Sequence, residues 1–362
     1  MGVPLVDLQA AHAEVAEEVE LGFKRVIANT AFVGGAEVAA FEREYAEFTG
    51  VPYCVGVANG TDALELALRA VGVGPGDEVI IPANTFIATA EAVACAGATV
   101  VPVDMDPATY LMDTDAALAA VTKRTKAIMP VHLYGQLAPV ERLADKGTII
   151  IEDAAQCQGA TRHGRGAGSW GIAGTSFYPG KNLGAYGDAG AVVSTDETLA
   201  TTVRTIAAHG GLVKYAHDLI GRNSRLDALQ AVVLRAKLAR LAKGNAARRA
   251  AAQRYDALLA DVDVVRPVTL EGNEHVWHLY VIQVPADRDG VVARLNADGI
   301  GAGIHYPTPV HLTKAFDGLG LKKGAFPHAE AAATKILSLP LFPQITEAQQ
   351  ELVVERLKAA LA

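Results

Sequence analysis

The stretch TIIIEDAAQ (148–156) decides the fold class of this 362-residue chain. Its apolar residues form a continuous run without polar alternation, which is typical of a strand buried on both faces of a parallel sheet. Similar runs, with helical patterns between some of them, are CVGV (54–57), EVIIP (78–82), TVVPVD (99–104), KAIMPVHL (126–133), GTSFYP (174–179) and GAVVST (190–195). We therefore predict an α/β fold in which a mostly parallel seven-stranded sheet lies between helices.

The pattern changes after a long helical stretch at about 226–260, which is rich in Ala, Leu and Arg. The segments that follow are predicted as a strand at VWHLYVIQV (276–284), a helix at DGVVARLNADGIG (289–301), and a strand that runs into a Pro-rich loop at AGIHYPTPVH (302–311). We predict a large domain over residues 1–235 and a smaller C-terminal α/β domain over residues 236–362. No flexible linker separates them.

Composition and charge argue against several classes of protein. The net charge of −8 comes from acidic and basic residues mixed along the chain, so nothing indicates nucleic-acid binding. The most basic segment, 235–254, is predicted as a helix with a solvated charged face. No apolar run approaches the ~20 residues that cross a bilayer, and the first residues do not resemble a signal peptide, so we expect a soluble, cytoplasmic protein without membrane attachment. Cys54, Cys95 and Cys157 are too scattered for a disulfide framework, and no metal site is expected.

Two side chains near the ends of predicted strands could carry chemistry. Asp153 lies at the C-terminal end of a very apolar strand, where open α/β sheets bind ligands, although a carboxylate there equally suits a helix cap. Gln156 lies on the same face if a helical turn follows. Lys181 follows a Pro-Gly turn in a Gly-rich segment that allows close approach of a bulky ligand. Taken alone, Lys181 could also be a solvated surface lysine.

A strand, a Gly turn and a helix start coincide in VANGTDAL (57–64), and free N–H groups at such a helix end bind anions. The same pattern is found in an ordinary capped helix. Asn223 precedes a second helix in GRNSRLDALQAV (221–232), where it could equally be an N-cap. GVGPGDE (72–78) is excluded as a dinucleotide site because its glycines follow a helix and precede a strand, the reverse of the required order.

Together, and in this order, these motifs resemble the DegT family of nucleotide-sugar aminotransferases. The matching segments are ANGTDAL, PANTFIAT, VDMDPATY, PVHLYGQ, IEDAAQ, SFYPGKNLGAYGDAG, NSRLDALQA, HYPTPVHL and ILSLP, over roughly residues 5–340. The resemblance implies the fold-type I architecture of aspartate aminotransferase, with pyridoxal 5′-phosphate (PLP) as cofactor in the large domain.

The resemblance also implies roles for individual residues. Lys181 matches the lysine that binds PLP covalently and moves a proton during the transfer, and Asp153 matches the carboxylate that keeps the pyridine nitrogen protonated. The other implied cofactor contacts are Phe86 stacked on the ring, Gln156 beside the ring hydroxyl, Gly60, Thr61, Asp62 and Ser176 at the phosphate, and Asn223 reaching the phosphate from the neighbouring subunit of a homodimer. The implied substrate contacts are Phe32, Val33, Tyr178, His305 and Tyr306.

The implied reaction moves an amino group from L-glutamate to a keto-sugar nucleotide. The motifs most resemble members that aminate dTDP-linked 3-keto-6-deoxyhexoses at C3, in deoxysugar and antibiotic biosynthesis. Amination at C4, a UDP-linked 3-keto sugar acid and a keto-cyclitol remain alternatives. A sugar dehydratase is disfavoured because those members have histidine where this chain has Lys181. A PLP-binding regulator without catalysis is a further alternative.

Overall fold

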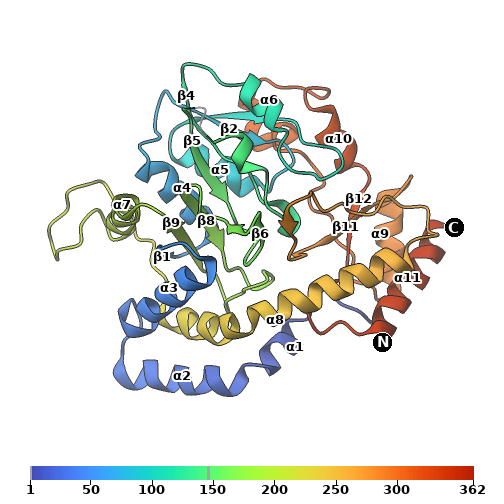
Figure 1. Ribbon diagram of the computed structural model, residues 1–362, viewed down its shortest axis with the longest axis horizontal. Coiled ribbons are helices and arrows are strands. Elements are labelled where there is room, and N and C mark those ends of the chain that lie inside the picture. Colours follow the sequence, from blue (N-terminus) through green and yellow to red (C-terminus); the bar gives the residue numbers. More distant parts are fainter. Residues whose placement is uncertain (1, 145–146) are drawn as a thin grey trace.

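The computed structural model describes residues 2–144 and 147–362 and is built around a seven-stranded sheet (Figure 1). The strand order is β1 (Tyr53–Val57), β9 (Gly190–Ser194), β8 (Ile172–Ser176), β5 (Ile149–Asp153), β4 (Thr125–Ile128), β2 (Glu78–Pro82) and β3 (Thr99–Val103). Neighbours from β8 to β3 pair in parallel, whereas β9 pairs antiparallel with both β8 and β1. The predicted α/β class and mostly parallel sheet are confirmed.

Helices cover both faces of this sheet. One face packs on α4 (Gly60–Ala70), α5 (Ile87–Cys95) and α7 (Glu197–Ala207), and the other on α3 (Gly35–Thr49) and α8 (Ala228–Leu258), with α2 (Ala16–Asn29) outside them (Figure 1). Within β9, Val192 packs in the first layer and Val193 in the second. Because successive strand residues point to opposite faces, a strand buried on both faces needs the continuous apolar run seen in the sequence.

The C-terminal part has its own apolar cluster. It contains the antiparallel pair β11 (Tyr280–Gln283) and β12 (Ile336–Leu339), the helices α9 (Arg288–Ala297) and α11 (Glu347–Leu361), and the end of α8. The predicted boundary at 235/236 falls inside α8, which continues without a break from Ala228 to Leu258. The division into two domains at that residue stays a prediction.

Two strand predictions in this part need correction. The strand predicted over 276–284 is only β11, Tyr280–Gln283. The segment 302–311 forms no strand; Gly303 makes a single bridge to Ser338. Pro307 and Pro309 prevent a strand from continuing through this segment, because proline has no N–H to donate to a sheet.

The remaining elements are short. They are the helices α1 (Leu8–Ala13), α6 (Thr114–Ala119) and α10 (Pro327–Ala333), the 3₁₀ helices η1 (Leu133–Gly135), η2 (Val140–Arg142), η3 (Val310–Leu312) and η4 (Lys314–Leu319), and the strands β6 (Thr161–Arg162), β7 (Arg165–Gly166) and β10 (Asn273–Glu274). Within residues 2–144 and 147–362, no helix is both long and apolar enough to cross a membrane. Cys54 and Cys157 are buried, Cys95 is exposed, and all three are free thiols.

Candidate active site

A cavity of about 710 Å³ lies at the carboxyl ends of the parallel strands. The sheet contributes Asp153 at the end of β5 and Ser176 at the end of β8, and α4 contributes its first residues. The opposite wall comes from chain segments far away in sequence, including Leu5 near the N-terminus and Leu279 beside β11. This is the edge at which open α/β sheets bind ligands.

Most of the predicted site residues meet in this cavity. Those that line it are Gly60, Thr61, Asp62, Phe86, Asp153, Gln156, Ser176, Tyr178, Lys181, His305 and Tyr306. Phe32, Val33 and Asn223 do not line it, and all three are exposed. Val33 pairs with Asp227, and Asn223 lies four residues before that position, so these three residues gather next to the start of α8. Their assigned roles stay predictions.

Asp153 is almost completely buried at the end of β5. Its Oδ1 accepts the N–H of Ala155 at 3.1 Å, and its Oδ2 accepts the hydroxyl of Thr89 at 2.7 Å. The Thr89 hydroxyl in turn lies 2.7 Å from that of Thr85. Burial raises the pKa of Asp153, while the bond from Thr89 and the charge of Lys181 oppose the rise. A carboxyl group with a raised pKa is suited to share a proton with a basic ring nitrogen.

Lys181 is held in place by a tight turn, because its N–H donates to the carbonyl of Tyr178 at 2.8 Å. Its amine lines the cavity that contains Asp153. Burial lowers the pKa of Lys181 from 10.5 to about 8, and the negative charge of Asp153 partly opposes this. A far larger fraction of this amine is therefore neutral at pH 7 than of a solvated lysine, and only the neutral amine attacks a carbonyl group.

The N-terminus of α4 forms an anion site. Asn59 caps the helix and its Oδ1 accepts the N–H of Asp62 at 2.8 Å, which leaves the N–H groups of Gly60 and Thr61 without a partner among the described residues. A Cβ on Gly60 would lie 2.5 Å from the Cβ of Ser176, so glycine is needed for the helix to approach β8 this closely. The two N–H groups and the Ser176 hydroxyl make a cradle that fits a phosphate.

Two carboxylates near this cradle are balanced by two guanidinium groups. Arg222 Nη2 lies 2.9 Å from Asp62 Oδ1, and Arg222 also pairs with Glu65. The Nη1 of Arg69 lies 3.5 Å from Oε1 of the same Glu65. An unpaired carboxylate in the first turn of α4 would repel a phosphate. The ion pairs therefore make the acidic first turn compatible with an anion.

An amide and an aromatic ring define another side of the cavity. The Oε1 of Gln156 accepts the N–H of Tyr134 at 2.7 Å, so its Nε2 faces the other way and donates to the Tyr306 hydroxyl at 2.9 Å. The ring of Tyr306 lies 5.2 Å from the half-exposed ring of Phe86. An amide donor next to an accessible aromatic face fits a planar ring that carries a hydroxyl group.

Sequence reasoning missed other residues of the site. The cavity is also lined by Leu5, Val6, Leu64, Thr85, Ala88, Val131, Ala155, Gly180, Asp188, His278 and Leu279, and by the capping residue Asn59. Thr89, which holds Asp153, follows Thr85 by four residues, and this helical spacing within the matched motif was a usable signal. His278 had no such signal, because its side chain reaches the cavity only through the tertiary fold.

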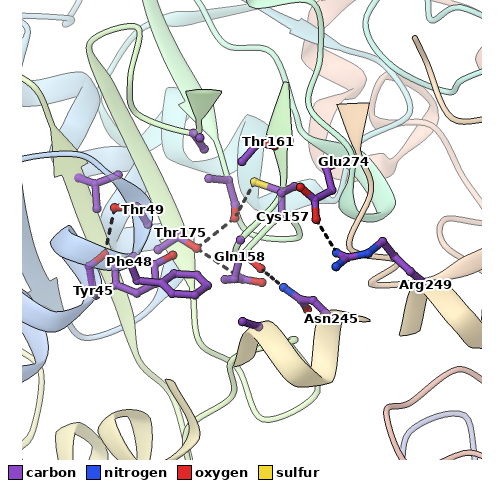
Figure 2. A pocket seen from close by; sticks show the side chains of 17 residues that line it. Tyr45, Phe48, Thr49, Cys157, Gln158, Thr161, Thr175, Asn245, Arg249 and Glu274 are labelled. Carbon is purple, nitrogen blue, oxygen red and sulfur yellow. Dashed lines mark hydrogen bonds and ion pairs between the residues drawn. The ribbon is translucent and has the colours of Figure 1, made fainter. Parts of the chain in front are cut away.

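A second cavity, of about 220 Å³, lies between α3, α8 and the turn after β5 (Figure 2). Its lining includes none of the predicted site residues. Gln158 Nε2 donates to Thr175 Oγ1 at 3.0 Å, and Asn245 Nδ2 donates to the Gln158 carbonyl at 2.9 Å. Asn245 belongs to α8, so these bonds hold the turn that follows Asp153 against that helix.

Comparisons with known proteins show the family of this chain. The model of the DegT/DnrJ/EryC1/StrS aminotransferase family matches residues 13–358. A pleiotropic regulatory protein of Geobacillus stearothermophilus is 44% identical, covering 99% of this chain and 98% of that protein. The dTDP-3-amino-3,4,6-trideoxy-alpha-D-glucose transaminase of Streptomyces venezuelae is 43% identical, covering 98% of this chain and 95% of the relative.

Two solved structures also match nearly the whole of this chain. The structure of S. venezuelae DesV in complex with a ketimine intermediate superposes with a TM-score of 0.96 at 42% identity, over 99% of this chain and 98% of DesV. NtdA from Bacillus subtilis, solved with bound cofactor PMP, superposes with a TM-score of 0.89 at 33% identity, over 99% of this chain and 83% of NtdA.

The fold and the site define a PLP-dependent enzyme of fold type I, because a buried lysine, a buried carboxylate and a phosphate cradle meet at the edge of the sheet. The chain belongs to the DegT/DnrJ/EryC1/StrS aminotransferase family. The predicted enzyme class, a PLP-dependent sugar aminotransferase, is confirmed.

The lowered pKa of Lys181 predicts how the cofactor-free protein reloads. Since only the neutral amine reacts, the rate of covalent PLP uptake should rise about tenfold per pH unit below about pH 8 and then level off. A solvated lysine would give a rate that still rises above pH 9. Stopped-flow absorbance after PLP is added at a series of pH values measures this profile. A rate that keeps rising to pH 10 would contradict the burial of the amine.

Proposed function

We propose that the enzyme transfers the amino group of L-glutamate to C3 of a dTDP-linked 3-keto-6-deoxyhexose. The observation that carries this proposal is the single cavity in which Lys181, Asp153 and the N-terminus of α4 meet. The sugar and the position are supported by the S. venezuelae relative, which is named for a dTDP-3-amino sugar. A role in deoxysugar and antibiotic biosynthesis, in the cytoplasm, belongs to the same proposal.

Each residue has a defined task in this reaction. PLP, when bound, supplies a ring that withdraws electrons from the carbon bearing the amino group. The Nζ of Lys181 would move a proton between the amino-acid carbon that bears the amino group and C4′ of the cofactor. The lowered pKa of Lys181 favours this transfer near neutral pH. The Oδ2 or Oδ1 of Asp153 keeps a proton on the ring nitrogen, and the N–H groups of Gly60 and Thr61 orient the phosphate.

We further propose that two copies of the chain share their active sites. The arm between α7 and α8 (209–221) exposes the apolar side chains of Leu212, Val213, Tyr215, Leu219 and Ile220, and Figure 1 shows it extending away from the body next to α7. A surface of this kind is typical of a protein–protein contact. Asn223 follows the arm and lies outside its own cavity, so in a dimer it would reach the phosphate in the cavity of the other copy.

Mixing two inactive variants tests the shared site. Lys181→Ala and Asn223→Ala homodimers should each be strongly impaired. After subunit exchange, hybrid dimers hold one site with an intact lysine and an intact asparagine, so activity should return to about a quarter of the wild-type value. The measurement is transaminase activity after the mixture has been dissociated and reassembled.

The matched control mixes Lys181→Ala with Asp153→Asn. Both residues belong to the same chain's cavity, so every site in that hybrid stays defective and no activity should return. Equal recovery of activity in both mixtures would contradict an active site shared between the two chains. An Asn223→Ala enzyme with normal cofactor affinity and turnover would contradict it as well.

The substrate proposal is tested by separating the two half-reactions. The purified enzyme is first incubated with L-glutamate, and transfer of the amino group to the cofactor is followed by absorbance. After glutamate is removed, 3-keto and 4-keto dTDP-sugars are added separately. Recovery of the original spectrum with only the 3-keto sugar supports amination at C3, whereas recovery with only the 4-keto sugar would move the reaction to C4.

Two other results would change the proposal. If glutamate transfers no amino group but glutamine does, a keto-cyclitol becomes the leading acceptor. If PLP binds but no amino acid donates, the chain would be a regulator, a reading in line with the name of the G. stearothermophilus relative.

A further inference from the structure

His278 lines the active-site cavity, and none of the roles derived above uses it. Its side chain is 8% exposed and belongs to the segment that leads into β11. Its Nδ1 lies 3.3 Å from the Oδ1 of Asn182, the residue that follows Lys181. The histidine is therefore connected to the segment that carries the reactive lysine.

The hydrogen bonds around Asn182 fix which atoms donate. Asn245 must place its Nδ2 at the carbonyl of Gln158, 2.9 Å away, since a carbonyl only accepts. The Oδ1 of Asn245 thus faces Asn182 and accepts from its Nδ2 at 2.9 Å. The same Nδ2 donates to the carbonyl of Val276 at 2.9 Å. Both amide hydrogens of Asn182 are used, and only its Oδ1 remains to meet His278.

This arrangement determines the tautomer of His278. Because Asn182 Oδ1 accepts, Nδ1 of His278 must carry the hydrogen. Burial and the positive charges of Lys181 and Arg248, with smaller effects of His305 and His275, hold the pKa of His278 well below 6.5, so the ring is neutral. Nε2 is then a lone-pair acceptor, and it makes no hydrogen bond to any residue within 2–144 and 147–362.

We propose that His278 is a positioning residue whose unprotonated Nε2 accepts an N–H from an amine beside Lys181. Because Nε2 makes no hydrogen bond to Lys181 within the described residues, the amine is the amino group being transferred. An acceptor on one side of an amine turns its remaining hydrogens and lone pair in defined directions, which is what transfer of a proton between two carbons requires. The inference rests on the aminotransferase chemistry and not on the identity of the sugar.

Two variants separate the acceptor from the bond to Asn182. In His278→Asn the side-chain amide can still donate where Nδ1 does, but nothing accepts in the place of Nε2. In His278→Gln the longer side chain can put its oxygen near the Nε2 position. We expect His278→Asn to lower kcat/KM about 10- to 100-fold, the worth of a hydrogen bond to a charged group, and His278→Gln to restore most of it.

The pH profile of PLP uptake is the control for an effect on Lys181. Since Nε2 makes no hydrogen bond to Lys181 within the described residues, His278→Asn should leave the midpoint of the profile at about 8 and lower only turnover. Wild-type turnover in His278→Asn, or a midpoint that moves together with turnover, would overturn the proposal.

A third measurement identifies the tautomer of His278 directly. In the ¹⁵N-histidine-labelled holoenzyme, long-range ¹H–¹⁵N correlation spectra report which ring nitrogen of each of the 10 histidines carries hydrogen. His278 is assigned by the signal absent from His278→Gln. We expect the hydrogen on Nδ1 and a ring that is still neutral at pH 6.5. A hydrogen on Nε2, or titration near pH 6.5, would overturn the proposal.

Discussion

Replacing Lys181 with alanine is expected to abolish transamination, with a fall in turnover of about 10⁴-fold or more. The substitution removes the proposed site of covalent PLP attachment, which is also the only lysine or arginine side chain among the described residues that line the cavity. The absorbance band of the attached cofactor should disappear as well. Circular dichroism and thermal unfolding should remain close to wild type, because the lost side chain leaves a space that opens to the cavity.

Lys181→Arg is the matched variant. It keeps a positive charge near Asp153, but a guanidinium group does not deprotonate near neutral pH and cannot act as the base. We expect it to be as inactive as the alanine variant. Appreciable turnover in either variant would contradict the assignment. Activity in the arginine variant alone would mean that the charge, and not proton transfer, is the contribution of Lys181.

Asp153→Asn should have the second-largest effect, a fall in turnover of about 10²- to 10⁴-fold. The amide oxygen of the variant can accept the N–H of Ala155, and its NH2 can donate to the hydroxyl of Thr89, so the end of β5 should keep its geometry and PLP should still bind. What is lost is the charge that is proposed to keep a proton on the ring nitrogen. The measurements are steady-state kinetics and the spectrum of bound PLP.

Thr89→Val provides the control for this variant. It removes one hydrogen bond to Asp153 but leaves the carboxylate in place. With one opposing bond removed, burial should raise the pKa of Asp153 further, and turnover should fall only modestly. Near-normal turnover of Asp153→Asn would mean that another group protonates the ring.

The sequence predicted the layers of the fold because each strand satisfies a strong local rule. A strand between two helical layers needs apolar residues on both faces. Residues 149–151 of β5, and their neighbours in the sheet, are apolar in this way. The direction of β9 was not predictable, since a buried antiparallel strand has the same composition as a parallel one. The prediction over 302–311, a strand that runs into a Pro-rich loop, was wrong about the strand, because only Gly303 makes a bridge there.

Most of the predicted site residues line the active-site cavity, whereas the residues that surround and hold them were not predicted, for one physical reason. Lys181 and Asp153 lie within motifs whose spacing is local. The partners that tune them depend on tertiary contacts: the N–H of Asp62, expected at the phosphate, is already used by the side chain of Asn59. Phe32, Val33 and Asn223 lie outside this chain's cavity, and of these three only Asn223 was predicted to act in the neighbouring subunit.

Helix α8, of 31 residues and about 45 Å, constrains how the reactive groups fluctuate. Asn245 on this helix bonds to the residue after Lys181, and Arg248, about one turn later, donates to the carbonyl of the residue before His278 at 3.2 Å. Both loops are thus fastened to a single turn of one continuous helix. Thermal displacement of the helix moves both loops in the same direction. The distance between Lys181 and His278 therefore varies less than the position of either residue.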